Sequence, residues 1–541
     1  MLSKDSLIKG TVILAAAALV ARVLGVVQRV PLVYLIHDSG MATYSIAFNI
    51  YMLLLTIATA GIPSALSKLV AERMELGRFA EANRIYRAAI QFALVAGVIM
   101  TVFLYFYAPF QAERSGDPDA ALAIQALAPA LLLFPLIAIM RGYFQGRRNM
   151  MPNGLSQIIE QVMRLLTAIG FAYLFLAIGW GQVWAVAGAS FGGVMGSVGA
   201  VAVLLYYAMR LKKRDAAEGQ VPTEEEVEHA AALPYKRIYK SLFRTSIPIV
   251  LFSLAVPLIY FIDSSTVIPL LQGSLGWDAA RDQLGILAGR AQSLAGIPII
   301  LAIALSQSIV PIISSAYAKK DLVQVKGQAA KALQLSLLTG LPAVIMIAVA
   351  ARPINGLLFP DENGYGIIAL LTATALFQIV MQTSGAILMG MGAMRPLVGH
   401  VVIGIAVKLI ANYVLSPILG IYGIVTATAL CFIVMMGLNL RTMKQKADFR
   451  IFDTRRWIGL TVTAALMIAA GVAVEWLGHR YIRWFPAKLD YLLQAAVAGA
   501  VMFGLYLVLL ALTKVVTAED LESYPAPIRK LVRKGARVMG R

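Results

Sequence analysis

Apolar residues occur along the chain in long stretches that short polar connections separate. Each stretch is about 20 residues long, which is enough for an α-helix to cross the ~30 Å hydrocarbon core of a membrane. There are fourteen, at approximately 8–36, 44–66, 88–110, 120–143, 153–178, 183–209, 246–271, 284–316, 332–351, 366–390, 397–416, 422–440, 457–477 and 490–513. The pattern predicts an all-α polytopic membrane protein with about 14 transmembrane helices.

Lysines and arginines are distributed unequally between alternate connections. In membrane proteins such residues are retained on the cytoplasmic side. If the N-terminus is cytoplasmic, the cytoplasmic connections and both termini hold 36 of them and the outer connections hold six. We therefore expect a multi-pass protein of the bacterial cytoplasmic membrane with both termini in the cytoplasm. The net charge of +19 then reflects topology, and its dispersion over loops argues against a nucleic-acid-binding surface.

Composition supports the membrane class, because 60% of the 541 residues are hydrophobic and only 14% are charged. The single cysteine, Cys431, excludes an internal disulfide and a cysteine-based metal cluster. The four histidines are dispersed and lack the spacing of metal ligands. We therefore expect no metal and no cofactor.

A few charged residues fall inside the predicted spans. Each costs ~3 kcal/mol at the centre of a membrane, and such residues usually face a helix-bundle interior or a watery cavity. Away from the ends of the spans, five are basic and two are acidic, a surplus of three positive charges that suits an anionic ligand. They are Arg22, Arg29, Arg164, Arg290, Lys408, Glu160 and Asp263.

Structural explanations exist for several of these charges. Glu160 and Arg164 have the i, i+4 spacing and order that favour a pair on one helix. Asp263 and Arg290 lie on consecutive spans, where they could tie two helices together. Arg29 could extend its guanidinium outward along the membrane. Arg22, by contrast, has no acidic residue within one helical turn, and we expect it to face a cavity.

An internal repeat relates the two halves of the chain. Segments 146–164 and 390–408 each begin with glycine, have proline six positions later and end twelve positions further with a basic residue, Arg164 or Lys408. The copies lie six spans apart and so have the same orientation. Symmetric halves with polar sites are typical of alternating-access transporters. We expect an N-lobe at 1–210, a cytoplasmic linker at 211–245, a C-lobe at 246–442, two further helices at 455–513 and a basic tail at 514–541.

Several segments resemble the MurJ-type lipid II flippases, and in particular their Gram-positive YtgP/SpoVB-like branch. The family belongs to the multidrug/oligosaccharidyl-lipid/polysaccharide exporter superfamily. The match covers nearly the whole chain and depends on the order and spacing of its motifs. They are ARVLGVVQR at 21–29, GMAT at 40–43, AGIPSALSKLVAE at 60–72, RGYFQGRRNMMP at 141–152, SQIIEQVMR at 156–164 and GRAQSLAGIPIILAIALSQSIVPIISS at 289–315.

The resemblance implies translocation of undecaprenyl-diphosphate-linked disaccharide pentapeptide, lipid II, to the outer membrane leaflet. It also implies a cationic cavity to which Arg22 and Arg290 contribute, and a lipid-tail groove formed by the last two helices. The chain departs from the better-known Gram-negative members at Gln28–Arg29 and at Tyr44. The complete set of candidate substrate-binding residues is Arg22, Arg29, Arg141, Glu160, Arg164, Asp263, Arg290 and Lys408.

Other functions remain open on sequence grounds. A flippase for teichoic acid, capsule or another lipid-linked oligosaccharide would share the cationic cavity, and a drug/cation antiporter would use Glu160. An intramembrane glycosyltransferase or polymerase would need a metal–nucleotide motif such as DPD at 117–119, but the Ser-Gly-Asp-Pro context predicts a turn. We expect a transporter without enzymatic activity. It should act on its lipid-linked substrate as a monomer among membrane lipids, with the cell-wall synthesis machinery as the partner to consider.

Overall fold

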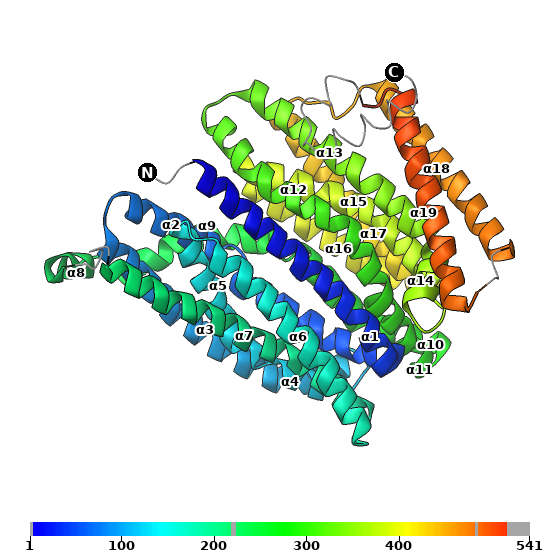
Figure 1. Cartoon of the computed structure of the whole chain (residues 1–541), viewed down its shortest axis with the longest axis horizontal. Helices are drawn as coiled ribbons and strands as arrows, with labels where there is room; N and C mark the ends of the chain where they lie inside the picture. The colour runs from blue at the N-terminus through cyan, green and yellow to red at the C-terminus, as the bar shows by residue number, and fades with distance from the viewer. Residues whose placement is uncertain (1–3, 218–222, 482–484, 517–541) are drawn as a thin grey trace. The chain divides into compact units, whose positions relative to one another are not determined.

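The structure, a computed structural model, describes residues 4–217, 223–481 and 485–516 (Figure 1). These residues are predominantly α-helical, and no strand occurs among them. Twelve described segments are long and apolar enough to cross a membrane. The first two predicted spans merge into one of these segments, and the eighth, 284–316, includes side chains outside the described set, which accounts for the difference from fourteen. The prediction of an all-α multi-pass membrane protein is confirmed.

The chain divides into two compact units. Unit one comprises Met1–Gly289 and Asn412–Gly420, and unit two comprises Arg290–Ala411 and Ile421–Arg541. Most of the predicted basic tail, residues 517–541, lies outside the described residues. The lobe boundaries proposed from the sequence stay a prediction.

Unit one is built mainly from the N-terminal helices. The short helix α11 continues directly into a π-helix, η1, at whose Gly289 the unit ends. The elements are α1 (Lys4–Thr59), α2 (Ile62–Glu75), α3 (Phe79–Arg114), α4 (Ala120–Leu127), α5 (Ala130–Gly146), α6 (Met151–Ala177), α7 (Gln182–Ala217), α8 (Glu224–Ala231), α9 (Tyr235–Ser253), α10 (Ala255–Leu275), α11 (Trp277–Gly285) and η1 (Ile286–Ala291).

Unit two contains the remaining helices. The last turns of α16 belong to unit one, where Asn412 donates a hydrogen bond of 3.2 Å to the Thr266 hydroxyl of α10. The elements are α12 (Gln292–Ala318), α13 (Leu322–Val349), α14 (Ala351–Leu358), α15 (Tyr365–Gly390), α16 (Met394–Leu419), α17 (Ile421–Lys446), α18 (Thr454–Tyr481) and α19 (Ala487–Leu512).

Glycines of α7 allow it to pack closely against α6, and the two helices run side by side in Figure 1. A methyl group added at Gly192 would lie 2.9 Å from the Arg164 carbonyl oxygen. One added at Gly196 would lie 2.8 Å from the Glu160 carbonyl oxygen. Small residues at helix interfaces in membranes permit this close approach of backbones. The α7 sequence thus determines where the charged turn of α6 sits.

Helix α1 bends sharply at His37, which has φ 56° and ψ −177°. A residue other than glycine rarely adopts this backbone conformation, which costs about 1–3 kcal/mol and persists only where the surrounding structure holds it. The Ile36 carbonyl lies directly before the bend. Gln182, at the start of α7, donates a hydrogen bond to that carbonyl and another of 3.0 Å to the Ser39 hydroxyl.

The close packing of α6 and α7 predicts that Gly196→Ala destabilises the folded protein by about 1–3 kcal/mol, because its new methyl group meets backbone that cannot rotate away. Gly170→Ala in α6 is the matched control, since open space surrounds that position and alanine favours a helix. Thermal unfolding of both variants, purified in detergent, tests this. Equal midpoints for the two variants would contradict the packing argument.

Candidate functional site

The Glu160 carboxylate bridges two arginines within unit one. Arg164 Nη2 lies 3.0 Å from Glu160 Oε1, and Arg141 Nη2 lies 3.0 Å from Glu160 Oε2. Arg141 also donates through Nε to the Ser156 hydroxyl at 2.9 Å. Glu160 and Arg164 are both buried. One anion therefore serves two cations, and the cluster keeps a net positive charge.

Arg29 brings a further cation from α1. Its Nη1 donates to the Ala288 carbonyl of η1, and its guanidinium carbon lies 5.8 Å from the centre of the Phe48 ring. Helices α1 and α6 pack against each other. On the same α1 helix, the fully buried Tyr51 lies beside Arg164. The chain thus places Arg29 on the helix that also packs beside the Glu160 cluster.

The other two candidates in unit one differ in exposure. Arg22 is exposed on the part of α1 that precedes the bend. Asp263 is buried within α10, with 3% of its surface exposed. Their roles in a cavity stay predictions.

Arg290 is almost completely buried in unit two and is held by the loop before α15. Its Nη1 lies 2.8 Å from Asp361 Oδ1 and 3.2 Å from the Asp361 carbonyl oxygen. Its guanidinium carbon also lies 5.5 Å from the Phe359 ring centre. Arg290 lies in η1, and π-helical turns are frequently found at functional sites.

Lys408 is fully buried and is bound to a neighbouring helix of unit two. Its Nζ donates to the Ile424 carbonyl at 2.9 Å and to the Thr428 hydroxyl at 2.7 Å, both on α17. Arg164, its counterpart in the repeat, instead donates to Glu160. At Gly404, the counterpart of Glu160, an added methyl group would meet the Met435 side chain. The two repeat copies therefore use their basic position differently.

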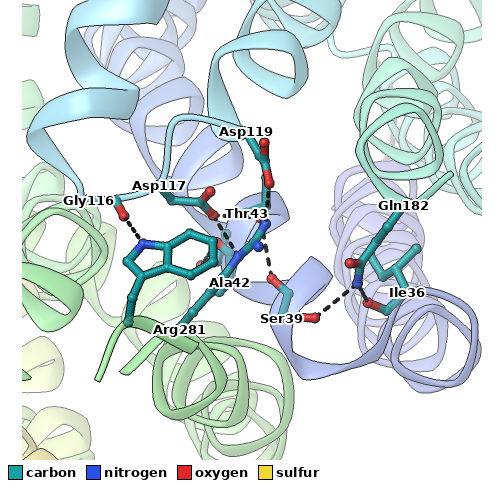
Figure 2. A network of polar contacts seen from close by, with 11 residues as sticks. Ile36, Ser39, Ala42, Thr43, Gly116, Asp117, Asp119, Gln182 and Arg281 are labelled. Carbon is teal, nitrogen blue, oxygen red and sulfur yellow. Dashed lines mark hydrogen bonds and ion pairs between the residues drawn. The ribbon is translucent and has the colours of Figure 1, made fainter. Parts of the chain in front are cut away.

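A second charged network in unit one was not predicted from the sequence. Figure 2 shows Arg281 of α11 converging with Thr43, Asp117 and Asp119. The loop around Asp117 forms the turn expected from its sequence. Its burial was not anticipated, and Asp117 has 0% of its surface exposed. The available signal was the combination of an acidic turn and an isolated arginine in two connections predicted on the same side of the membrane.

Three carboxyl groups outside the membrane-spanning segments have shifted pKa values. Burial raises the pKa of Asp117, and the Thr43 hydrogen bond and the Arg281 charge oppose this only in part. Burial also acts to raise the pKa of Asp361, but hydrogen bonds from Arg290 and the Asn363 amide outweigh it and leave the pKa lowered. The hydrogen bond from Arg352 lowers the pKa of Glu362.

Comparison with known proteins identifies the chain's relatives. Residues 7–317 match the family described as polysaccharide biosynthesis protein. The lipid II flippase MurJ of Bacillus subtilis (strain 168) is 28% identical over 520 residues, which are 93% of this chain and 94% of that protein. Stage V sporulation protein B of the same organism is 26% identical, over 98% of this chain and 100% of that protein.

Solved structures with low sequence identity share the fold. The structure described as lipid II flippase MurJ in an inward closed conformation has a TM-score of 0.65 and 14% identity, over 93% of this chain and 98% of that chain. An inward-facing multidrug resistance transporter of the MATE family has a TM-score of 0.64 and 14% identity, over 81% of this chain and 98% of that chain.

The bridging geometry predicts unequal effects of two neutral substitutions. Glu160→Gln leaves the buried Arg164 and the partly buried Arg141 without their carboxylate and should destabilise the protein by about 3–5 kcal/mol. Arg141→Gln, the matched control, leaves Glu160 paired with Arg164 and should cost less. Thermal unfolding monitored by size-exclusion chromatography measures both. A greater loss with Arg141→Gln would show that Glu160 does not balance the two cations.

Proposed function

Because the chain belongs to the polysaccharide biosynthesis protein family, we propose that it is a flippase for a lipid-linked oligosaccharide. We propose lipid II, the undecaprenyl-diphosphate-linked peptidoglycan precursor, as its substrate. Translocation runs from the inner to the outer leaflet of the bacterial cytoplasmic membrane by alternating access. The similarity to the lipid II flippase MurJ along 93% of this chain supports this assignment.

The observation that carries the proposal is the excess of cations among the candidate residues of unit one. The candidates of unit one include four arginines and two acidic residues, Glu160 and Asp263. The arginines are Arg22, Arg29, Arg141 and Arg164. A set intended only for structural neutralisation would have matched charges, since each uncompensated charge is costly in a membrane. The excess fits a ligand that brings its own negative charge.

A diphosphate supplies the complementary chemistry. It offers several acceptor oxygens, which the planar guanidinium binds through paired hydrogen bonds. Arg22 and Arg29 are assigned to the diphosphate, and Glu160 holds Arg141 and Arg164 in place. A hydrated cavity spares the headgroup the cost of contact with lipid tails. The polyprenyl chain meanwhile remains in hydrocarbon.

Arg290 is also assigned to phosphate binding, with Asp361 as its counter-ion in the absence of substrate. The Asp361 side chain is 46% exposed, whereas that of Arg290 is 1% exposed. An incoming phosphate would replace the Asp361 carboxylate as the anion paired with Arg290. Because the Asp361 side chain is exposed, water can hydrate its carboxylate once it is displaced. The carboxylate then re-forms its pair with Arg290 when the substrate leaves.

The lipid tail is assigned to the last two helices. α18 and α19 pack against each other and expose large apolar side chains, including Leu466, Val472 and Val501. Both termini are placed in the cytoplasm, in agreement with the distribution of basic residues. The flippase is proposed to act as a monomer and to make or break no covalent bond.

A flippase for a different lipid-linked oligosaccharide is the second candidate. It is favoured by the similarity to a sporulation protein, stage V sporulation protein B, along 98% of this chain. Teichoic acid and capsule precursors also carry a polyprenyl phosphate headgroup, so the same arginines would serve them.

Complementation of a strain depleted of its lipid II flippase tests the proposal. The unaltered chain should restore growth and deliver lipid II to the outer face. Arg22→Gln, Arg29→Gln and Arg290→Gln should each reduce growth and delivery strongly. Arg87→Gln, which changes an exposed arginine of α3, should not. Full rescue by these three variants at equal membrane abundance would refute the assignment of these arginines.

A binding comparison separates the two candidate substrates. Purified protein in nanodiscs should bind lipid II more tightly than undecaprenyl diphosphate, because the sugar and peptide add contacts. Native mass spectrometry with both ligands in competition measures this preference. Equal binding, or preference for a teichoic acid precursor, would favour the second candidate.

A further inference from the structure

Segment 277–289 is formed by α11 and the first residues of η1. It lies alongside α1 on both sides of the α1 bend. Before the bend, Arg29 donates to the Ala288 carbonyl. At the bend, Gly285 packs so closely that an added methyl group would clash with the Asp38 carbonyl oxygen. Beyond the bend, Arg281 Nη2 donates to the Thr43 hydroxyl at 2.7 Å. Segment 277–289 and residues 29–43 of α1 are therefore antiparallel.

Arg281 provides the ionic contacts of this segment. Its Nε lies 3.2 Å from Asp117 Oδ2, and its Nη2 lies 3.1 Å from Asp119 Oδ2. The Thr43 hydroxyl donates to Asp117 Oδ2 at 2.6 Å. Trp277 donates from its indole nitrogen to the Gly116 carbonyl at 2.7 Å, and the Arg281 guanidinium carbon lies 4.8 Å from the Trp277 ring centre. Figure 2 shows how α1, the 115–119 loop and α11 meet at this arginine.

The Arg281 network contains the Asp117 carboxylate, which water would stabilise if it were exposed. Asp117 is fully buried, and its Oδ1 has no hydrogen-bond partner among the residues that the structure describes. A buried acceptor left unsatisfied is costly. If the network opened, Asp117 would regain hydration at the same time as it lost Arg281. The gain in hydration offsets part of the loss of the ion pair, which lowers the free-energy cost of opening the network.

We propose that Arg281 is a positioning residue that locks segment 277–289 against both sides of the α1 bend. The lock holds the part of α1 that carries Arg22 and Arg29 in one position, and its release lets that part move. Both connections that build the lock are predicted to lie on the outer side of the membrane. Release of the lock on that side then precedes delivery of substrate to the outer leaflet. Only this last consequence rests on the proposed function.

Distance measurements on the full chain test the lock without any substrate. In a Cys431→Ser background, spin labels are placed at the exposed positions Val20 of α1 and Leu174 of α6. With Arg281 intact, we expect one narrow distance distribution in nanodiscs. Arg281→Gln should add a second distance population. Arg114→Gln, which changes an exposed arginine next to the same loop, should leave the distribution unchanged.

A double variant covers the case in which Arg281→Gln does not fold. Arg281→Gln with Asp117→Asn removes the buried charge along with its partner, so it should fold and still show the second population. If this folded variant gives the narrow distribution of the unaltered chain, Arg281 has a structural role only and the lock is refuted. Lipid II binding measured on the same variant is a separate readout. Failure of the proposed substrate therefore cannot be confused with failure of the lock.

Discussion

A guanidinium or ammonium group inside a membrane-spanning helix needs an acceptor in place of the water it has lost. The described cations meet this requirement in different ways. Arg164 and Arg141 share the Glu160 carboxylate, whereas Arg290 uses Asp361 from a loop. Lys408 uses a backbone carbonyl and a hydroxyl of α17. The choice of acceptor decides which cation can still receive a ligand, because a phosphate can replace or supplement a carboxylate more easily than a carbonyl fixed in a helix.

Close packing of helices places these acceptors. The glycines of α7 bring its backbone against α6 at Glu160 and Arg164, so the charged turn has little freedom to shift. In unit two, Gly404 packs against Met435 where unit one has Glu160. A side chain at that position would have to displace the Met435 side chain. The repeat copies therefore differ in the packing of this helix interface as well as in charge.

Helix α1 contacts both charged networks of unit one. One part carries Arg22 and Arg29, and the other carries Thr43 and the buried Tyr51 beside Arg164. His37 joins the two parts in a strained backbone conformation, which Gln182 supports through the Ile36 carbonyl. A strained joint between two anchored segments is a suitable place for movement, because the energy stored there favours departure from the observed state.

The sequence by itself determined the all-α membrane class and the positions of the spans, because the length and hydropathy of each stretch reflect membrane thickness locally. It also identified Glu160 and Arg164 as a pair, since i, i+4 spacing places them on one helix face. Only the tertiary structure decided that Arg141 shares Glu160, that Arg290 meets Asp361, and that Arg281 meets Asp117. These partners lie on different elements, and their approach depends on helix packing and on the bend in α1, which no local pattern encodes.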